Sequence, residues 1–151
     1  TLEGLKAAAP IIGLLGSVGF VLLFVIGIIS SALYVKSYQL DHDPQEIVID
    51  EVVGQMFTNL LCFLGSAILQ KTALPKIITP SVVSFITVFL LPFVLFRFFD
   101  ITKPWPINYV DKNIKGGIGI MLDDILAAIF ASVIFYAIVL GVLRFYPIQL
   151  T

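Results

Sequence analysis

The chain has 151 residues, of which 59% are hydrophobic and only 13% are charged, and its mean hydropathy is +1.06. Soluble proteins average roughly 25% charged residues, so this composition predicts a single membrane-embedded domain over residues 1–151. The formal net charge of −1 excludes a general basic surface for nucleic acid, and the single cysteine, Cys62, excludes an internal disulfide and a cysteine-cluster metal site.

Four apolar stretches have about the 20 residues that a helix needs to cross a bilayer. They are residues 7–35, 52–70, 77–96 and 125–143. We therefore expect an all-α, polytopic helical membrane bundle of about four transmembrane helices, with active-site loops at the membrane interface. Four spans would place segments 36–51 and 97–124 on one side of the membrane. Lysine and arginine counts, which mark cytoplasmic loops, do not decide which side that is.

The first acidic group precedes the second span. Asp43-Pro44-Gln45-Glu46 has the pattern of a capped helix start, and we expect that helix to continue through Asp50 and Glu51 into the membrane. Gly54 would let a partner helix approach closely. A polar stripe follows at helical spacing and should face the bundle interior: Glu51, Gln55, Thr58, Asn59 and Cys62. The simpler interpretation of Asp50 and Glu51 is a solvated helix end.

The second group lies in residues 97–106, RFFDITKPWP. Asp100 and Lys103 would be neighbours if this stretch were helical, and a weak surface ion pair is the simple explanation. Two prolines around Trp105 predict a rigid turn, while Trp105 and Tyr109 suit the membrane interface. A stiff turn that carries a cation near an acidic residue is also suited to holding a phosphate near a metal.

The third group, Asp123-Asp124, follows the glycine-rich run 115–119 near the start of the last span. Glycines let backbone N–H groups approach an anion, although a flexible turn is the commoner meaning of such a run. The helix dipole alone would also stabilise acids near a helix start. Three alanines give the last helix a small face for close packing: Ala127, Ala128 and Ala131.

Carboxylates in three separate groups, with only one histidine, favour a hard divalent cation such as Mg²⁺. Such a metal would polarise a phosphoryl group and activate water, and basic side chains would neutralise phosphate oxygens. The candidate metal ligands are Glu51, Asp100, Asp123 and Asp124. The candidate phosphate-binding residues are Lys103, Arg97 and Lys115. A small cation channel or transporter subunit is the alternative, but it should place its acids near the membrane midplane.

Three blocks of the sequence resemble the motif blocks of the phosphatidylglycerophosphatase A family: residues 43–55 (DPQEIVIDEVVGQ), 97–106 and 111–128 (DKNIKGGIGIMLDDILAA). The resemblance implies a Mg²⁺-dependent phosphatase of the bacterial inner membrane, multi-pass and with its site facing the cytoplasm. It would hydrolyse phosphatidylglycerophosphate to phosphatidylglycerol and phosphate in phospholipid biosynthesis, among membrane lipids and in an oligomeric state that the residues leave open.

The site residues that the resemblance implies are Asp50, Glu51, Asp100, Lys103, Asp123 and Asp124. The family usually also has an N-terminal block rich in glycine, proline and threonine, which Ala9-Pro10 and residues 13–17 echo only faintly. The chemistry leaves two routes open, attack by a metal-activated water and a covalent aspartyl-phosphate.

Overall fold

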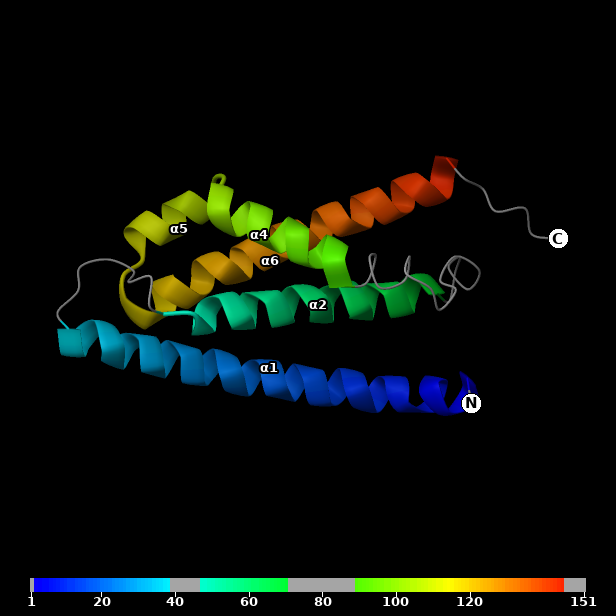
Figure 1. Cartoon of the computed structure of the whole chain (residues 1–151), viewed down its shortest axis with the longest axis horizontal. Helices are drawn as coiled ribbons and strands as arrows, with labels where there is room; N and C mark the ends of the chain where they lie inside the picture. Colours follow the sequence, from blue (N-terminus) through cyan, green and yellow to red (C-terminus); the bar gives the residue numbers. More distant parts are fainter. Residues whose placement is uncertain (1, 39–46, 71–88, 146–151) are drawn as a thin grey trace.

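The computed structural model describes residues 2–38, 47–70 and 89–145, which form five helices and no strand. This confirms the all-α prediction. The helices are α1 (Leu2–Tyr38), α2 (Ile49–Gln70), α4 (Leu91–Thr102), α5 (Ile107–Asn113) and α6 (Gly116–Phe145). In Figure 1, α1, α2 and α6 run along the long axis, while α4 and α5 form an elbow beside α6. Helices α2 and α6 begin at the end of the molecule where α1 finishes.

Two helices in the described ranges are long and apolar enough to cross a membrane, as judged by length and composition, over Gly13–Tyr38 and Gly116–Val142. Large apolar side chains cover the outside of α1; Leu14 is 65% exposed and Leu22 is 58% exposed. An apolar surface of this extent marks an interaction site rather than a face left to water. The two helices therefore indicate membrane association.

The predicted spans correspond to these helices only in part. The predicted spans 7–35 and 125–143 fall on α1 and α6, and the one over 52–70 falls on α2. Most of the span predicted over 77–96 lies outside the described residues. A count of four spans therefore stays a prediction.

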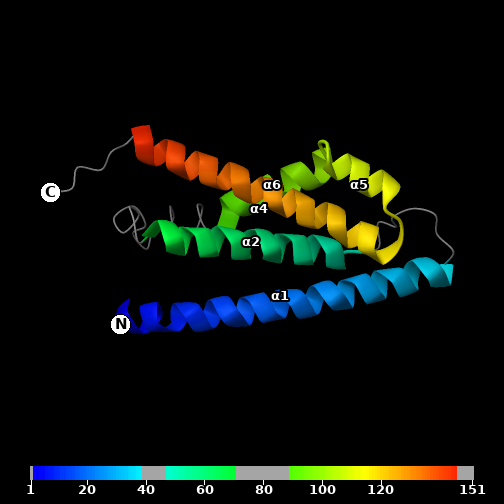
Figure 2. The ribbon, with the colours of Figure 1, turned by 180° about the vertical axis from the view of Figure 1, so that it is seen from behind.

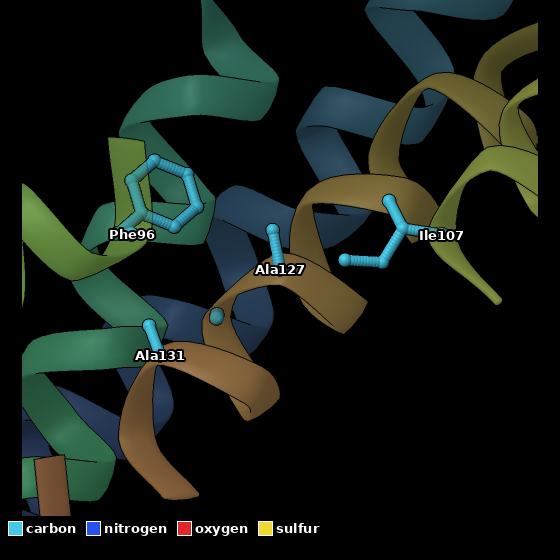
Figure 3. Close-up of a cluster of buried hydrophobic side chains, with 5 residues drawn as sticks. Phe96, Ile107, Ala127 and Ala131 are labelled. Atoms are coloured by element: carbon cyan, nitrogen blue, oxygen red, sulfur yellow. The ribbon is translucent and has the colours of Figure 1, made fainter. Parts of the chain in front are cut away.

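The core lies where α4 and α5 cover α6. Phe96 of α4 and Ile107 of α5 are fully buried against three alanines of α6, Ala127, Ala128 and Ala131. Figure 3 shows the Phe96 and Ile107 side chains reaching this strip of small residues from two sides of Ala127. Because alanines let the helices approach closely, the elbow sits directly on α6. The predicted small face of the last helix is confirmed.

Helix α2 packs against both α4 and α6. The view from behind also shows α2 alongside α6 (Figure 2). A Cβ atom on Gly54 would lie 2.6 Å from Cζ of Phe96 and 3.1 Å from Cβ of Asp124. The predicted close approach at Gly54 is therefore confirmed. Further along α2, Thr58 and Cys62 are buried, so this part of the polar stripe faces the interior as expected.

The start of α2 differs from the prediction. Helix α2 begins at Ile49, and residues 47 and 48 lie outside any helix. The expected continuous helix from the capping pattern through Asp50 is therefore wrong at this junction. Ile47 and Val48 are β-branched, which lowers their preference for a helix. The capping pattern itself, residues 43–46, lies outside the described residues.

The start of α6 also differs from the prediction. A flexible turn was the simpler interpretation of the glycine-rich run, but from Gly116 onward the run forms the first helical turn of α6. Gly116 has φ +75°, a left-handed conformation that suits glycine. A Cβ atom on Gly117 would overlap the carbonyl oxygen of Ile28 on α1. The glycines therefore let α6 begin tightly against α1, and Asp123 and Asp124 lie about two turns inside the helix rather than at its start.

Candidate active site

Three acidic segments that are far apart in the chain meet at the end of the bundle where α2 begins. Asp50, Asp123 and Asp124 are buried, with relative exposures of 7%, 3% and 3%. The negative charge of Asp124 is repelled by the nearby carboxylates of Asp100, Asp123 and Asp50. The acids project from helices rather than from the predicted interfacial loops: Asp50 from α2, Asp100 from α4 and Asp123-Asp124 from α6. Rigid helices can therefore fix their relative positions.

Arg97 connects two of these segments. Its Nη1 atom lies 2.8 Å from Oε2 of Glu51 on α2 and 2.9 Å from Oδ2 of Asp100 on its own helix, α4. The side chains of Arg97 and Glu51 are 33% and 45% exposed, and solvent weakens such ion pairs. The structure thus places Arg97, a predicted phosphate-binding residue, between two acids at the edge of the cluster.

Lys103 is the residue that follows α4, and its backbone is left-handed, with φ 38° and ψ 59°. Its N–H donates a hydrogen bond of 2.9 Å to the carbonyl oxygen of Phe99. A left-handed conformation costs a non-glycine residue roughly 1–2 kcal/mol, so surrounding contacts must hold it. The left-handed turn directs the Lys103 side chain away from its own helix toward α5 and α6.

There the Lys103 ammonium binds two carboxylates. Its Nζ atom lies 2.7 Å from Oδ1 of Asp111 and 2.6 Å from Oδ2 of Asp123. Burial alone lowers the pKa of the Lys103 ammonium, but these two carboxylates hold the net pKa above its usual value. Lys103 is thus charged at neutral pH. The expected pairing of Lys103 with Asp100 is wrong, because α4 ends at Thr102 before the pair can share a helical face.

The rigid turn predicted around Trp105 is confirmed. Residues 104–106 form a turn between α4 and α5, and the N–H of Ile107 donates to the carbonyl oxygen of Pro104 at 2.8 Å. The Trp105 side chain is 81% exposed and Tyr109 is 59% exposed. The turn therefore directs Lys103 into the cluster and exposes aromatic rings on the outside.

Asp111 and Lys115 are two further residues of the third motif block, 111–128. Asp111, the first residue of that block, was not among the predicted site residues, yet it contacts Lys103. The contact depends on the turn at Lys103 and on the packing of α5. Lys115 lies in the link between α5 and α6, with an exposed side chain. Its backbone is eight residues before Asp123, which corresponds to about 12 Å along a helix. Phosphate binding by Lys115 stays a prediction.

Carboxylate oxygens are the donors that Mg²⁺ prefers. Among the described residues, no three His, Cys, Asp or Glu side chains meet at a spacing that would hold a metal ion. However, Oδ1 of Asp123 and Oδ2 of Asp124 are buried and accept no hydrogen bond in the described part of the chain. Burying an unpaired carboxylate oxygen is costly, so the chemistry of these two donors fits a bound cation.

Fold and site together define a helical, membrane-associated protein with a carboxylate-rich site at one end of its bundle. The family profile described as "Phosphatidylglycerophosphatase A" matches residues 6–139. Because this match covers most of the chain, the protein belongs to the phosphatidylglycerophosphatase A family.

Individual relatives agree with this assignment. Phosphatidylglycerophosphatase A of Haemophilus influenzae is 39% identical over 97 residues, which cover 64% of this chain and 48% of that protein. The Escherichia coli protein of the same name is 52% identical over 46 residues, covering 30% of this chain and 27% of the relative. A Bacteroides thetaiotaomicron protein, provisionally named phosphatidylinositol-3-phosphatase, is 30% identical over 92 residues, covering 61% of this chain and 46% of that protein.

In these matches the chain spans half or less of the length of the curated relatives. No solved structure matches the chain.

Proposed function

We propose that this protein hydrolyses phosphatidylglycerophosphate to phosphatidylglycerol and phosphate, as a step of phospholipid biosynthesis at the cytoplasmic face of the bacterial inner membrane. The observation that carries the proposal is the convergence of acids from three motif blocks, together with Lys103, at one end of an apolar bundle. A site at the end of membrane helices suits a lipid headgroup, whereas a cation path needs acids deep within the bundle. Family membership and two relatives named for this activity support the substrate.

Lys103 is the residue best placed to bind the phosphomonoester. It is charged, it lies beside the buried Asp123, and the left-handed turn directs it into the cluster. Arg97 would contribute positive charge from the α4 side, although Glu51 and Asp100 both compete for it. The positive charges of both side chains would offset the negative charge that develops on the phosphoryl oxygens.

Charge balance supports a metal requirement. The cluster and its ion pairs contain six carboxylates and two basic side chains, namely Asp50, Glu51, Asp100, Asp111, Asp123 and Asp124 with Arg97 and Lys103. A phosphomonoester itself carries roughly two negative charges at neutral pH, so the uncompensated site would repel it. A divalent cation would reverse this local balance.

The residues that would hold Mg²⁺ are Glu51, Asp100, Asp123 and Asp124, whose side chains would have to come closer together around the ion than they lie here. When bound, the ion would polarise the phosphoryl group and lower the pKa of water. The chain's own part is to bring these carboxylates from three helices to one end of the bundle and to orient the phosphate through Lys103. Apolar burial around Phe96, directly beneath the cluster, would limit the entry of bulk water.

A phosphate-release assay tests the proposal. Purified protein in mixed micelles is given phosphatidylglycerophosphate, with phosphatidylinositol 3-phosphate in parallel, in Mg²⁺ or in excess chelator. We expect Mg²⁺-dependent release from the first lipid. Asp124→Asn should remove most of the turnover, whereas Arg144→Gln, in the last turn of α6, should leave it intact. No release from phosphatidylglycerophosphate would contradict the substrate, and equal release in chelator would contradict the metal.

A further inference from the structure

The Lys103 ammonium has two carboxylate partners on two different helices. Asp111 on α5 accepts one hydrogen bond at 2.7 Å, and Asp123 on α6 accepts another at 2.6 Å. The Asp123 side chain is 4% exposed and that of Asp111 is 31% exposed. The buried partner is also a proposed metal ligand, whereas Asp111 has no role in the proposed reaction.

An ammonium group has three N–H donors, and it rotates unless its partners hold it. With two donors bound to carboxylates on different helices, the direction of the third is defined. Asp123 alone would leave the group free to turn about a single hydrogen bond. The second carboxylate is therefore what orients the remaining donor.

We propose that Asp111 is a positioning residue, which orients the Lys103 ammonium so that its third N–H points to the substrate phosphate. This inference rests on the proposed function, since it takes a lipid phosphomonoester as the partner of Lys103. The short helix α5 is itself held in place, because Ile107 and Val110 are buried and α5 packs on α6. Asp111 thus acts from a fixed support.

Kinetics of three variants test the proposal. Asp111→Ala removes the acceptor, and Asp111→Asn keeps a neutral acceptor of nearly the same shape. Lys112→Gln changes the charge of the exposed neighbour on α5. We expect Asp111→Ala to raise KM for the lipid about tenfold while kcat changes less than about twofold, since a misdirected donor weakens binding of the phosphate in ground and transition states alike. Asp111→Asn should recover most of the affinity, and Lys112→Gln should match the wild type.

A second measurement does not depend on turnover. Labelling of Lys103 by an amine-reactive reagent, followed by mass spectrometry without substrate, reports how firmly the ammonium is held. We expect the rate in Asp111→Ala to rise at least about threefold over wild type, because one of two charge-assisted hydrogen bonds is lost. If wild-type protein releases no phosphate from the lipid, the proposed function fails, while the labelling result still shows whether Asp111 holds Lys103.

Two results would overturn the inference. One is an Asp111→Ala variant whose KM and Lys103 labelling both equal those of wild type. The other is a variant that loses kcat and thermal stability together, without recovery in Asp111→Asn, which would make Asp111 a purely structural residue.

Discussion

Gly54 offers the most direct test of how α2, α4 and α6 meet. In Gly54→Ala the new Cβ atom would lie 2.6 Å from Cζ and 2.7 Å from Cε2 of Phe96, whereas ordinary van der Waals contacts of Cβ atoms are 3.4–4 Å. The Phe96 ring must therefore retreat by about 1 Å. Because Phe96 is 0% exposed, the ring has no open space to enter, and the helices must move apart.

Gly19→Ala on α1 is the matched control, since a Cβ atom there would meet nothing within 4 Å. Replacing glycine by alanine within a helix stabilises it by roughly 0.5–1 kcal/mol, and this gain is common to both variants. The difference between them isolates the overpacking, which costs about 1–3 kcal/mol. Turnover should fall on the order of 100-fold in Gly54→Ala, because a displacement of about 1 Å at the site misaligns Asp124 with the acids of α2 and α4.

Thermal unfolding in detergent micelles, followed by circular dichroism, measures the difference in stability. Phosphate release from the lipid measures turnover in the same preparations. We expect Gly54→Ala to unfold at a lower temperature than Gly19→Ala and to lose most of its activity. Equal melting temperatures together with full turnover in both variants would refute the close meeting of the three helices at Gly54.

Three further predictions concern contacts away from the cluster. Tyr136→Phe removes the O–H that donates to the carbonyl oxygen of Leu61 and should cost about 1 kcal/mol of stability; unchanged unfolding would show that the bond does not join α6 to α2. The fluorescence of Trp105, the sole tryptophan, should be quenched by lipids that carry bromine near the headgroup. Fluorescence emission typical of a tryptophan in water would argue against a turn at the membrane interface. Gly117→Ala should lower the melting temperature more than Gly19→Ala, because its Cβ atom would overlap Ile28.

The sequence predicted the all-helical class and the small residues that allow close packing. Both follow from local composition: long apolar runs form helices in a membrane because their backbone groups must be hydrogen-bonded internally, and glycine or alanine on a helix permits close approach. Gly54 and the Ala127 face were found in this way. Acidic residues beside apolar runs are costly and therefore conspicuous, so Asp50, Asp100, Asp123 and Asp124 could be named in advance. Asp111, which binds Lys103 from α5, was not.

What the sequence by itself determined is therefore which residue types had to be in the bundle. The tertiary structure decided their partners. Lys103 binds Asp111 and Asp123 rather than Asp100 because a single left-handed residue ends α4 and turns the side chain toward two other helices. Such a contact depends on one backbone angle and on how α5 and α6 pack, and neither leaves a periodic pattern in the sequence. Local chemistry can be read along the chain, but contacts between helices exist only once the chain has folded.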